Sequence, residues 1–130
     1  MQLLIVRHAE AAPGSPDELR RLTQRGREQA RKLGEELRNR ALRPDAVVSS
    51  PLLRARETAA ALDLGAPEID ERLAPGATPD DIRSVATGRG ELVVVVGHQP
   101  DCGRAVVALT GGPEPGFPPC GHALVELVHA

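Results

Sequence analysis

The sequence predicts an α/β fold, a single-domain three-layer sandwich whose central sheet is mainly parallel. Two short apolar runs support this prediction, residues 2–6 (QLLIV) and 92–96 (LVVVV), because such uninterrupted runs are typical of strands covered on both faces. Each run is followed by a helical pattern, and strands that alternate with helices favour a parallel sheet. The length of 130 residues suits one domain, residues 1–130.

The first half of the chain predicts two helices and a third strand. A weaker strand pattern covers residues 45–49 (DAVVS). The first helix is predicted from an apolar stripe of small and aliphatic residues, in which the glycine would allow close approach to the sheet: Gly26, Ala30, Leu33 and Leu37. In the second helix, within residues 50–62, Ser50 is expected as the N-cap and Pro51 at the first helical position.

The second half is less regular. A short helix is expected from Asp80 to about Thr87, after a turn-rich stretch. Another helix is expected to end near residue 110, before a Gly/Pro-rich loop over 111–121. Residues 122–128 (HALVELV) then predict a last strand, at an edge of the sheet.

Composition narrows the classes of function. The net charge of −2, with no basic cluster among aromatic residues, gives no reason to expect a nucleic-acid partner. No apolar run is long enough to span a membrane, and we expect a cytoplasmic protein without a signal peptide. Cys102 and Cys120 form no CxxC pair and predict passive, reduced thiols. Glycine-rich nucleotide motifs are absent, so we expect no cofactor.

Three predicted strand ends carry residues that suggest a common site. Arg7 and His8 follow the first strand, Arg54 lies in the first turn of the helix after the second, and His98 follows the run at 92–96. Ligands of open α/β sheets bind at the carboxyl ends of the strands. We therefore expect these four side chains to converge at one edge of the sheet.

Such a positively charged cluster favours a phosphoryl group as ligand. A phosphoryl group carries about −1.5 to −2 charge at pH 7 and three acceptor oxygens, which guanidinium groups match well. A metal site is the alternative, and the neighbouring arginines disfavour it; its ligands would be His8, Glu10, His98 and His122. His122 and His129 are expected to be structural or surface residues.

The two histidines can divide the chemistry of phosphoryl transfer. Neutral imidazole is a nucleophile toward phosphorus, and arginines beside His8 would keep its ring neutral. His98 is then the better proton donor or stabiliser of the transition state.

Three motifs, "RHAEA", "SSPLLRARETA" and "VGHQPD", resemble in order and separation those of the histidine phosphatase superfamily, which has the phosphoglycerate mutase-like fold. The resemblance implies that His8 is the phosphorylated nucleophile, with Arg7, Arg54 and His98 around the phosphate. The stretch "RRLTQRG" at 20–26 resembles the short SixA-type phosphohistidine phosphatases of that family. On that match Arg20 is an additional phosphate ligand, although a solvated arginine explains it equally well.

Two positions depart from the family pattern. Ala9 replaces the usual glycine after the histidine, and Pro75 stands where many phosphomonoesterases of the family have an acid. An alkoxide leaving group needs protonation more than an imidazole does, so the missing acid favours an N–P bond as substrate. Three carboxyl groups remain as substitutes for that acid: Glu10, Asp70 and Glu71.

Three functions therefore remain open. The first is a phosphatase acting on phosphohistidine in a phosphorylated protein, the second a phosphatase or mutase for small phosphate esters, and the third a non-catalytic phosphate-binding module. Only forty-three residues separate Arg54 from His98, too few for a large helical cap over a small substrate. The short spacing thus favours an open site that admits a protein-borne phosphate.

Overall fold

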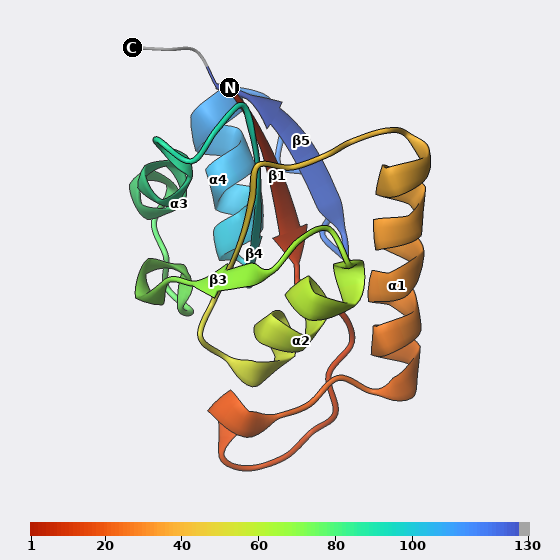
Figure 1. Ribbon diagram of the computed structural model, residues 1–130. Helices are drawn as coiled ribbons and strands as arrows, with labels where there is room; N and C mark the ends of the chain where they lie inside the picture. Colours follow the sequence, from red (N-terminus) through yellow and green to blue (C-terminus); the bar gives the residue numbers. More distant parts are fainter. Residues whose placement is uncertain (128–130) are drawn as a thin grey trace.

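The computed structural model describes residues 1–127, and within them the chain forms one five-stranded sheet in the order β3-β2-β4-β1-β5. The strands are β1 (Gln2–Arg7), β2 (Ala46–Ser49), β3 (Pro67–Ile69), β4 (Leu92–Gly97) and β5 (His122–Glu126). The first four run parallel, whereas β5 pairs antiparallel with β1 at an edge (Figure 1). This arrangement confirms the mainly parallel sheet and the predicted edge strand.

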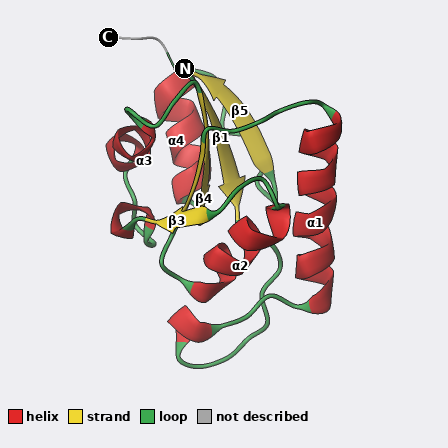
Figure 2. Cartoon of the chain, viewed as in Figure 1, coloured by secondary structure: helices red, strands yellow, loops and turns green. Residues whose placement is uncertain are grey.

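Helices cover both faces of the sheet, which confirms the three-layer sandwich (Figure 2). On one face α1 (Gln24–Asn39) and α2 (Leu53–Leu62) pack over Leu4 and Val6 of β1. On the other, α3 (Pro79–Ala86) and α4 (Asp101–Thr110) pack over Leu3 and Ile5. Successive side chains of a strand point to opposite faces, so a continuous apolar run can supply both cores.

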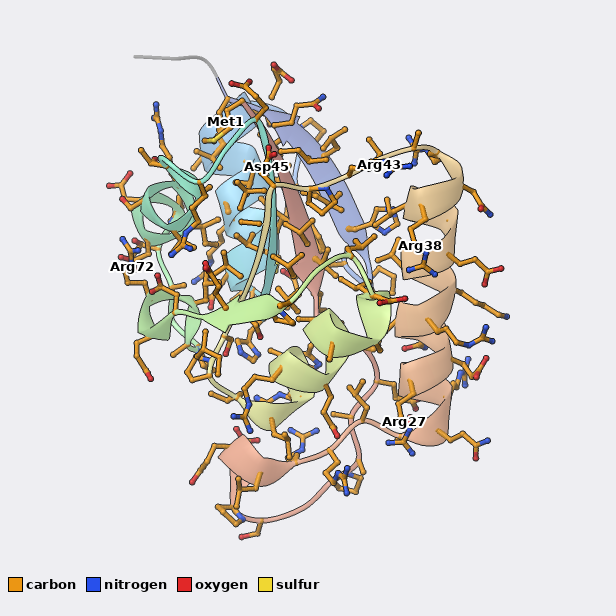
Figure 3. All side chains as sticks on the ribbon, viewed as in Figure 1. Met1, Arg27, Arg38, Arg43, Asp45 and Arg72 are labelled. Atoms are coloured by element: carbon orange, nitrogen blue, oxygen red, sulfur yellow. The ribbon has the colours of Figure 1, made fainter. Side chains whose placement is uncertain are left out.

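The close approach predicted for Gly26 has a different partner. A Cβ atom at this position would overlap the backbone carbonyl of Glu10, in the loop after β1, so the expected contact with the sheet is wrong. Thr23 caps α1 by accepting a hydrogen bond from the Gly26 N–H at 2.9 Å. Farther along α1, Arg38 donates to the carbonyl oxygens of Leu62 and Asp63, which ties α1 to the end of α2 (Figure 3).

The start of α2 also differs from the prediction. The helix begins at Leu53 with Leu52 at the N-cap position, so Ser50 is not its cap and Pro51 is not its first residue. The backbone N–H of Ser50 instead donates to the carbonyl of Val96 at 3.0 Å, which extends the pairing of β2 with β4 by one residue. Ser50 and Pro51 therefore lie at the carboxyl end of β2, before α2 begins.

The region between α2 and β4 contains elements that the sequence pattern did not indicate. β3 has only three residues, all exposed, and so lacks the apolar run of a central strand. The 3-10 turn η2 (Glu71–Leu73) was likewise not predicted, and neither was η1 (Asp17–Leu19), which lies between β1 and α1. The short helix near Asp80 is confirmed as α3, which Thr78 caps in a reciprocal pair of hydrogen bonds with Asp81.

Helix α4 ends at Thr110, as expected, and a loop free of helix and strand follows to β5. None of the described helices combines the length and apolarity that crossing a bilayer requires. His129 lies outside the described residues.

Candidate active site

Backbone hydrogen bonds continue across the sheet just beyond the carboxyl ends of the strands. The N–H of Asp70 donates to the Ser49 carbonyl, and that of His8 donates to the Gly97 carbonyl, both at 3.0 Å. With the bond of Ser50 described above, they hold the segments after β1, β2, β3 and β4 side by side. The same end of the sheet faces the start of α2 and η1, at the lower end of Figure 1. The predicted motifs therefore meet at one edge.

His8 and His98 lie together at this edge. Their ring centroids are 5.2 Å apart and the ring planes are inclined by 58°. Arg7, the last residue of β1, pairs in register with Gly97, the last residue of β4, so the two histidines follow on neighbouring strands. The parallel pairing of β1 with β4 is thus what brings the rings together.

The ring of His8 has a defined tautomer. Its Nδ1 atom lies 2.7 Å from the carbonyl oxygen of Ala9, and a carbonyl can only accept a hydrogen bond. Nδ1 therefore carries the proton of the neutral ring, which leaves the lone pair on Nε2. The N–H of Ala9 in turn donates to the Oγ1 of Thr58, so the turn that follows His8 is anchored to α2.

His98 is 4% exposed and is held by Ser50. Its Nε2 atom lies 2.8 Å from the Ser50 Oγ, and the N–H of Leu52 donates a hydrogen bond to the same oxygen. The Nδ1 atom of His98 is buried and has no hydrogen-bond partner in the described part of the chain. A buried polar nitrogen without a partner is unfavourable, and a bound anion or water would satisfy it.

Arg7 and Arg54 each present a similar unpartnered group. The Nη1 of Arg7 donates to the carbonyl of Phe117 at 2.8 Å, and both Nη atoms of Arg54 donate to Asp17. Within residues 1–127 the Nε atoms of the two arginines are buried without partners. Among residues 1–127 three buried nitrogens of this site thus lack partners, the Nε atoms of Arg7 and Arg54 and the Nδ1 of His98, and they suit an anionic ligand.

Burial lowers the pKa of both histidines. The pKa of His8 falls to about 4, chiefly because burial disfavours the charged ring and secondarily through the charges of Arg54, Arg7 and Arg20. The pKa of His98 falls to about 3, for which burial is again the largest cause, followed by the charge of His8 and that of Arg54. Repulsion by the arginines was expected as the main reason for a neutral His8, and burial outweighs it.

Arg20 lies in the loop between β1 and α1. Its Nε donates to the carbonyl of Ala12 at 2.8 Å and its Nη1 donates to an oxygen of the Asp17 carboxylate at 3.0 Å. Its charge is the smallest of the effects that shift the pKa of His8 downward. Its side chain is 28% exposed.

Sequence reasoning did not find four residues that shape the site: Asp17, Ser50 as a partner of His98, Thr58 and Phe117. Thr58 is fully buried. Its Oγ1 donates to the carbonyl of Arg54 and accepts from the N–H of Ala9, so it connects α2 to the turn that follows His8. Its position four residues after Arg54, directly before three alanines, was the available signal. Asp17 and Phe117 lie in loops and gave none.

The three carboxyl groups considered as a proton donor differ in their surroundings. Asp70 pairs with Arg72 at 2.8 Å and with Arg89 at 3.6 Å, and hydrogen bonding to Arg72 lowers its pKa to about 2. Glu10 accepts a hydrogen bond from the hydroxyl of Thr23. Glu71 is exposed at the start of η2. The low pKa makes Asp70 a poor general acid.

Pro75 is exposed and lines a shallow surface cavity of about 360 Å³ beside η2. The buried Asp101 accepts hydrogen bonds from the N–H groups of the next two residues, Gly76 at 2.9 Å and Ala77 at 3.2 Å. The segment is therefore fixed to the start of α4, and no acid stands at the position of Pro75.

The metal site, the two cysteines and His122 were also considered in the sequence. Among the described residues no three His, Cys, Asp or Glu side chains are grouped as a metal site requires. Cys102 and Cys120 are free and buried in the cores on opposite faces of the sheet, and burial raises their pKa to about 12 and about 11. His122 is exposed on β5, as expected for a surface histidine.

Comparison with known proteins agrees with this geometry. Residues 3–75 match the model of the histidine phosphatase superfamily (branch 1). An uncharacterized protein of Picosynechococcus sp. is 34% identical over 123 residues, which cover 86% of this chain and 74% of that protein. The mitochondrial serine/threonine-protein phosphatase Pgam5 of Drosophila willistoni is 40% identical over 58 residues, but the match covers only 20% of its length.

Solved structures show the same fold over nearly the whole chain. The protein histidine phosphatase SixA, solved with tungstate, superposes with a TM-score of 0.88 at 28% identity and covers 98% of this chain and 88% of its own. A candidate SixA phosphohistidine phosphatase of Agrobacterium tumefaciens gives a TM-score of 0.82 at 26% identity, covering 95% and 89%. The chain therefore belongs to the histidine phosphatase superfamily and is a phosphatase with the phosphoglycerate mutase-like fold of SixA.

Proposed function

We propose that this phosphatase removes phosphate from phosphohistidine on a protein, with His8 as the group that is transiently phosphorylated. The observation that carries the proposal is the free lone pair on the Nε2 of His8, whose ring lies 5.2 Å from that of His98 and feels the charges of Arg54 and Arg7. Among residues 1–127 these three neighbours each keep one buried nitrogen without a hydrogen-bond partner. A phosphoryl group seated against those nitrogens would present its phosphorus to the free lone pair. No metal is needed for this attack, because the arginines supply the positive charge.

The reaction has two steps in which His8 first gains and then loses the phosphoryl group. The Nε2 of His8 forms a bond to phosphorus while the N–P bond of the substrate breaks, and the electron pair of that bond remains on the departing imidazole. Water then attacks phosphorus, the His8–phosphorus bond breaks, and its electron pair returns to Nε2. Inorganic phosphate leaves, and the second step regenerates neutral His8.

The surrounding residues would stabilise this transfer. The phosphoryl oxygens would accept hydrogen bonds from the guanidinium groups of Arg7, Arg54 and Arg20. Among residues 1–127 the Nε atoms of Arg7 and Arg54 have no other partner. His98 would donate a hydrogen bond or proton through Nδ1. Its ring is neutral in the free protein, and the negative charge of a bound phosphoryl group would raise its pKa toward the protonated form.

The surroundings of the leaving group favour phosphohistidine over alkyl esters. Pro75 offers no proton, and the pKa of Asp70 is too low for it to serve as the acid at neutral pH. The segment from Asp63 to Glu91 forms β3, η2 and α3 rather than a cap, and α3 packs against α4. A site without a cap favours a phosphate carried on a protein surface.

A phosphate ester is the second candidate substrate, because Glu10 and Glu71 remain as proton donors near the same edge. The Pgam5 relatives are serine/threonine-protein phosphatases, although this chain matches only a fifth of their length. Phosphoserine on a protein and small phosphate esters are therefore included in the test below.

We further propose that residues 1–130 act as one histidine phosphatase domain, since two cores share a single sheet. The free thiols of Cys102 and Cys120 support the proposal of a cytoplasmic protein, since the cytoplasm keeps cysteines reduced.

The test compares kcat/KM of the intact protein for a phosphohistidine protein, phosphoserine, p-nitrophenyl phosphate and a sugar phosphate. We expect the phosphohistidine protein to be the best substrate, the aryl ester to follow, and the two alkyl esters to be slowest. The His8→Ala variant should be inactive toward all four. A sugar phosphate or phosphoserine that is hydrolysed faster than phosphohistidine would contradict the proposed substrate and favour Glu10 or Glu71 as the acid.

A further inference from the structure

Asp17 contacts two of the arginines of the candidate site at once. One oxygen of its carboxylate accepts a hydrogen bond from the Nη1 of Arg20 at 3.0 Å, and the other accepts from the Nη2 of Arg54 at 3.2 Å. The backbone carbonyl of Asp17 accepts a third hydrogen bond, from the Nη1 of Arg54 at 2.9 Å. A single exposed residue therefore fixes both terminal nitrogens of Arg54.

The 12–21 loop that carries Asp17 is closed at its base. The N–H of Ala12 donates to the carbonyl of Arg21 at 2.8 Å, and Ala11 and Leu22 form an isolated β-bridge. Leu22 is held on both sides, by the Glu57 carboxylate of α2 at 2.8 Å and by the Nη1 of Arg27 in α1 at 3.0 Å (Figure 3 labels Arg27). These contacts fix the base of the loop, and the contact between Asp17 and Arg54 fixes its tip.

The pairing differs from an ordinary surface ion pair. The Arg54 side chain is only 8% exposed, whereas that of Asp17 is 61% exposed, so the carboxylate reaches a buried guanidinium from outside. Ion pairs between two exposed side chains contribute little to stability because water screens them. Here the consequence concerns orientation, because the bonds to Asp17 occupy one N–H of each terminal nitrogen of Arg54, while its Nε has no partner among residues 1–127.

We propose that Asp17 is a positioning residue of the phosphate site, which holds Arg54 and Arg20 as a pair so that their remaining N–H groups bind one phosphoryl group. The proposal rests on the proposed function, since it takes that phosphoryl group as the ligand. Asp17 itself does not contact the reacting atoms; it acts through the two arginines.

The charge of Asp17 fits this role. Arg7, Arg20 and Arg54 bring three positive charges to the site, and Asp17 reduces their sum to two, which balances a phosphoryl group of about −2. The same carboxylate favours the protonated form of His98, the group that would donate to the substrate. Asp17 thus limits repulsion among the arginines while the site is empty.

The opposite role is a carboxylate that competes with phosphate for the same arginine N–H groups. The two roles predict opposite effects of removing Asp17. Loss of a positioning residue weakens the binding of a phosphate analogue, whereas loss of a competitor strengthens it.

The experiment measures vanadate binding and steady-state kinetics with p-nitrophenyl phosphate for Asp17→Ala and Asp17→Asn in the intact chain. Asp17→Ala should weaken vanadate binding and lower kcat/KM by about tenfold or more, if roughly 1.4 kcal/mol of phosphoryl binding is lost. Asp17→Asn should retain part of both, because its amide oxygen and its backbone carbonyl can still accept from Arg54. Glu18→Gln is the matched control, since Glu18 is the neighbouring exposed carboxylate and forms no ion pair among residues 1–127; it should stay within about twofold of the wild type.

Vanadate bound equally or more tightly by a folded Asp17→Ala protein would overturn the proposal, and so would equal losses in Asp17→Ala and Glu18→Gln. Thermal unfolding identifies a variant that does not fold, and in that case the nearly isosteric Asp17→Asn decides by the same comparison with Glu18→Gln. The proposed function fails separately. If the wild type binds vanadate more tightly than Asp17→Ala does but does not hydrolyse phosphohistidine, the proposed substrate is wrong and the role of Asp17 stands.

Discussion

The Nδ1 of His8 donates a hydrogen bond to the carbonyl of Ala9, the residue that follows it, across 2.7 Å. This contact decides which nitrogen can attack phosphorus. We therefore predict that the phosphoenzyme carries its phosphate on the Nε2 of His8 and that the bond is labile in acid and stable in alkali. The measurement is NMR and mass spectrometry of protein trapped during turnover and quenched in alkali.

The same sample provides the control for this assignment. His8→Ala should incorporate no phosphate, whereas His122→Ala, which changes an exposed histidine of β5, should incorporate as much as the wild type. Phosphate found on Nδ1 of His8, on His98 or on Cys102 would show that the assignment is wrong.

Arg54 should not tolerate replacement by lysine. Lysine preserves the charge but loses the planar fork, including the Nε–H that lacks a partner in this structure and the two nitrogens bound to Asp17. We expect kcat/KM of Arg54→Lys to fall by about tenfold or more, which corresponds to a loss of at least ~1.4 kcal/mol of transition-state binding.

Arg56→Lys is the matched control for this substitution, because Arg56 lies in the same helix and is exposed to solvent. Its kcat/KM should remain within about twofold of the wild type. If Arg54→Lys and Arg56→Lys give the same kinetics, Arg54 lies outside the phosphate site.

Ser50 should matter through His98. Its Oγ is the hydrogen-bond partner of the His98 Nε2, and both residues are buried. Ser50→Ala leaves that nitrogen without a partner, at a cost of about 1–3 kcal/mol in the free energy of unfolding. Because the ring also loses its anchor, we expect kcat to fall with little change in KM, as measured by steady-state kinetics with p-nitrophenyl phosphate.

Ser49→Ala separates the catalytic effect from the loss of stability. Ser49 is equally buried, but its Oγ donates to the carbonyl of Ser50 rather than to His98. It should therefore lose stability with kcat nearly unchanged. Equal losses of kcat in both variants would mean that Ser50 acts only on folding.

The parts of this molecule that the sequence predicted are those tied to regular patterns. His8 and His98 follow short, uninterrupted apolar runs, and parallel pairing places the ends of such runs together, so their proximity could be expected. Arg54 could be placed because side chains of a helix lean toward its N-terminus.

The residues that escaped prediction depend on the path of irregular backbone. Asp17 reaches Arg54 only because the 12–21 loop closes at its base and turns through η1, and no periodicity in the sequence indicates this path. The Ser50–Pro51 pair was noticed in the sequence, but it fits either the start of a helix or the end of a strand. A serine before a proline is typical of a helix start, but here the backbone pairing of Ser50 with Val96 keeps it in the sheet and directs its hydroxyl to His98.

Stability should fall as the pH is lowered from 7 to 5, because of the histidine pair. The pKa values of His8 and His98 are about 4 and about 3 in the folded protein and about 6.5 when the chain is unfolded. Between these values the unfolded chain binds more protons than the folded protein, so the free energy of unfolding decreases as the pH falls. The pKa of Asp70, at about 2, confines its own contribution to lower pH.

His98→Gln isolates this effect, since glutamine can still bond to Ser50 but cannot take up a proton. Chemical unfolding at pH 7, 6 and 5 should show a smaller decrease for His98→Gln than for the wild type, with a difference approaching one proton per molecule in the slope. Inorganic phosphate should raise the stability of the wild type at each pH by binding only the folded protein. An identical pH dependence in the two proteins would mean that burial does not hold His98 neutral. The proposal that His98 takes up its proton only when substrate binds would then be wrong.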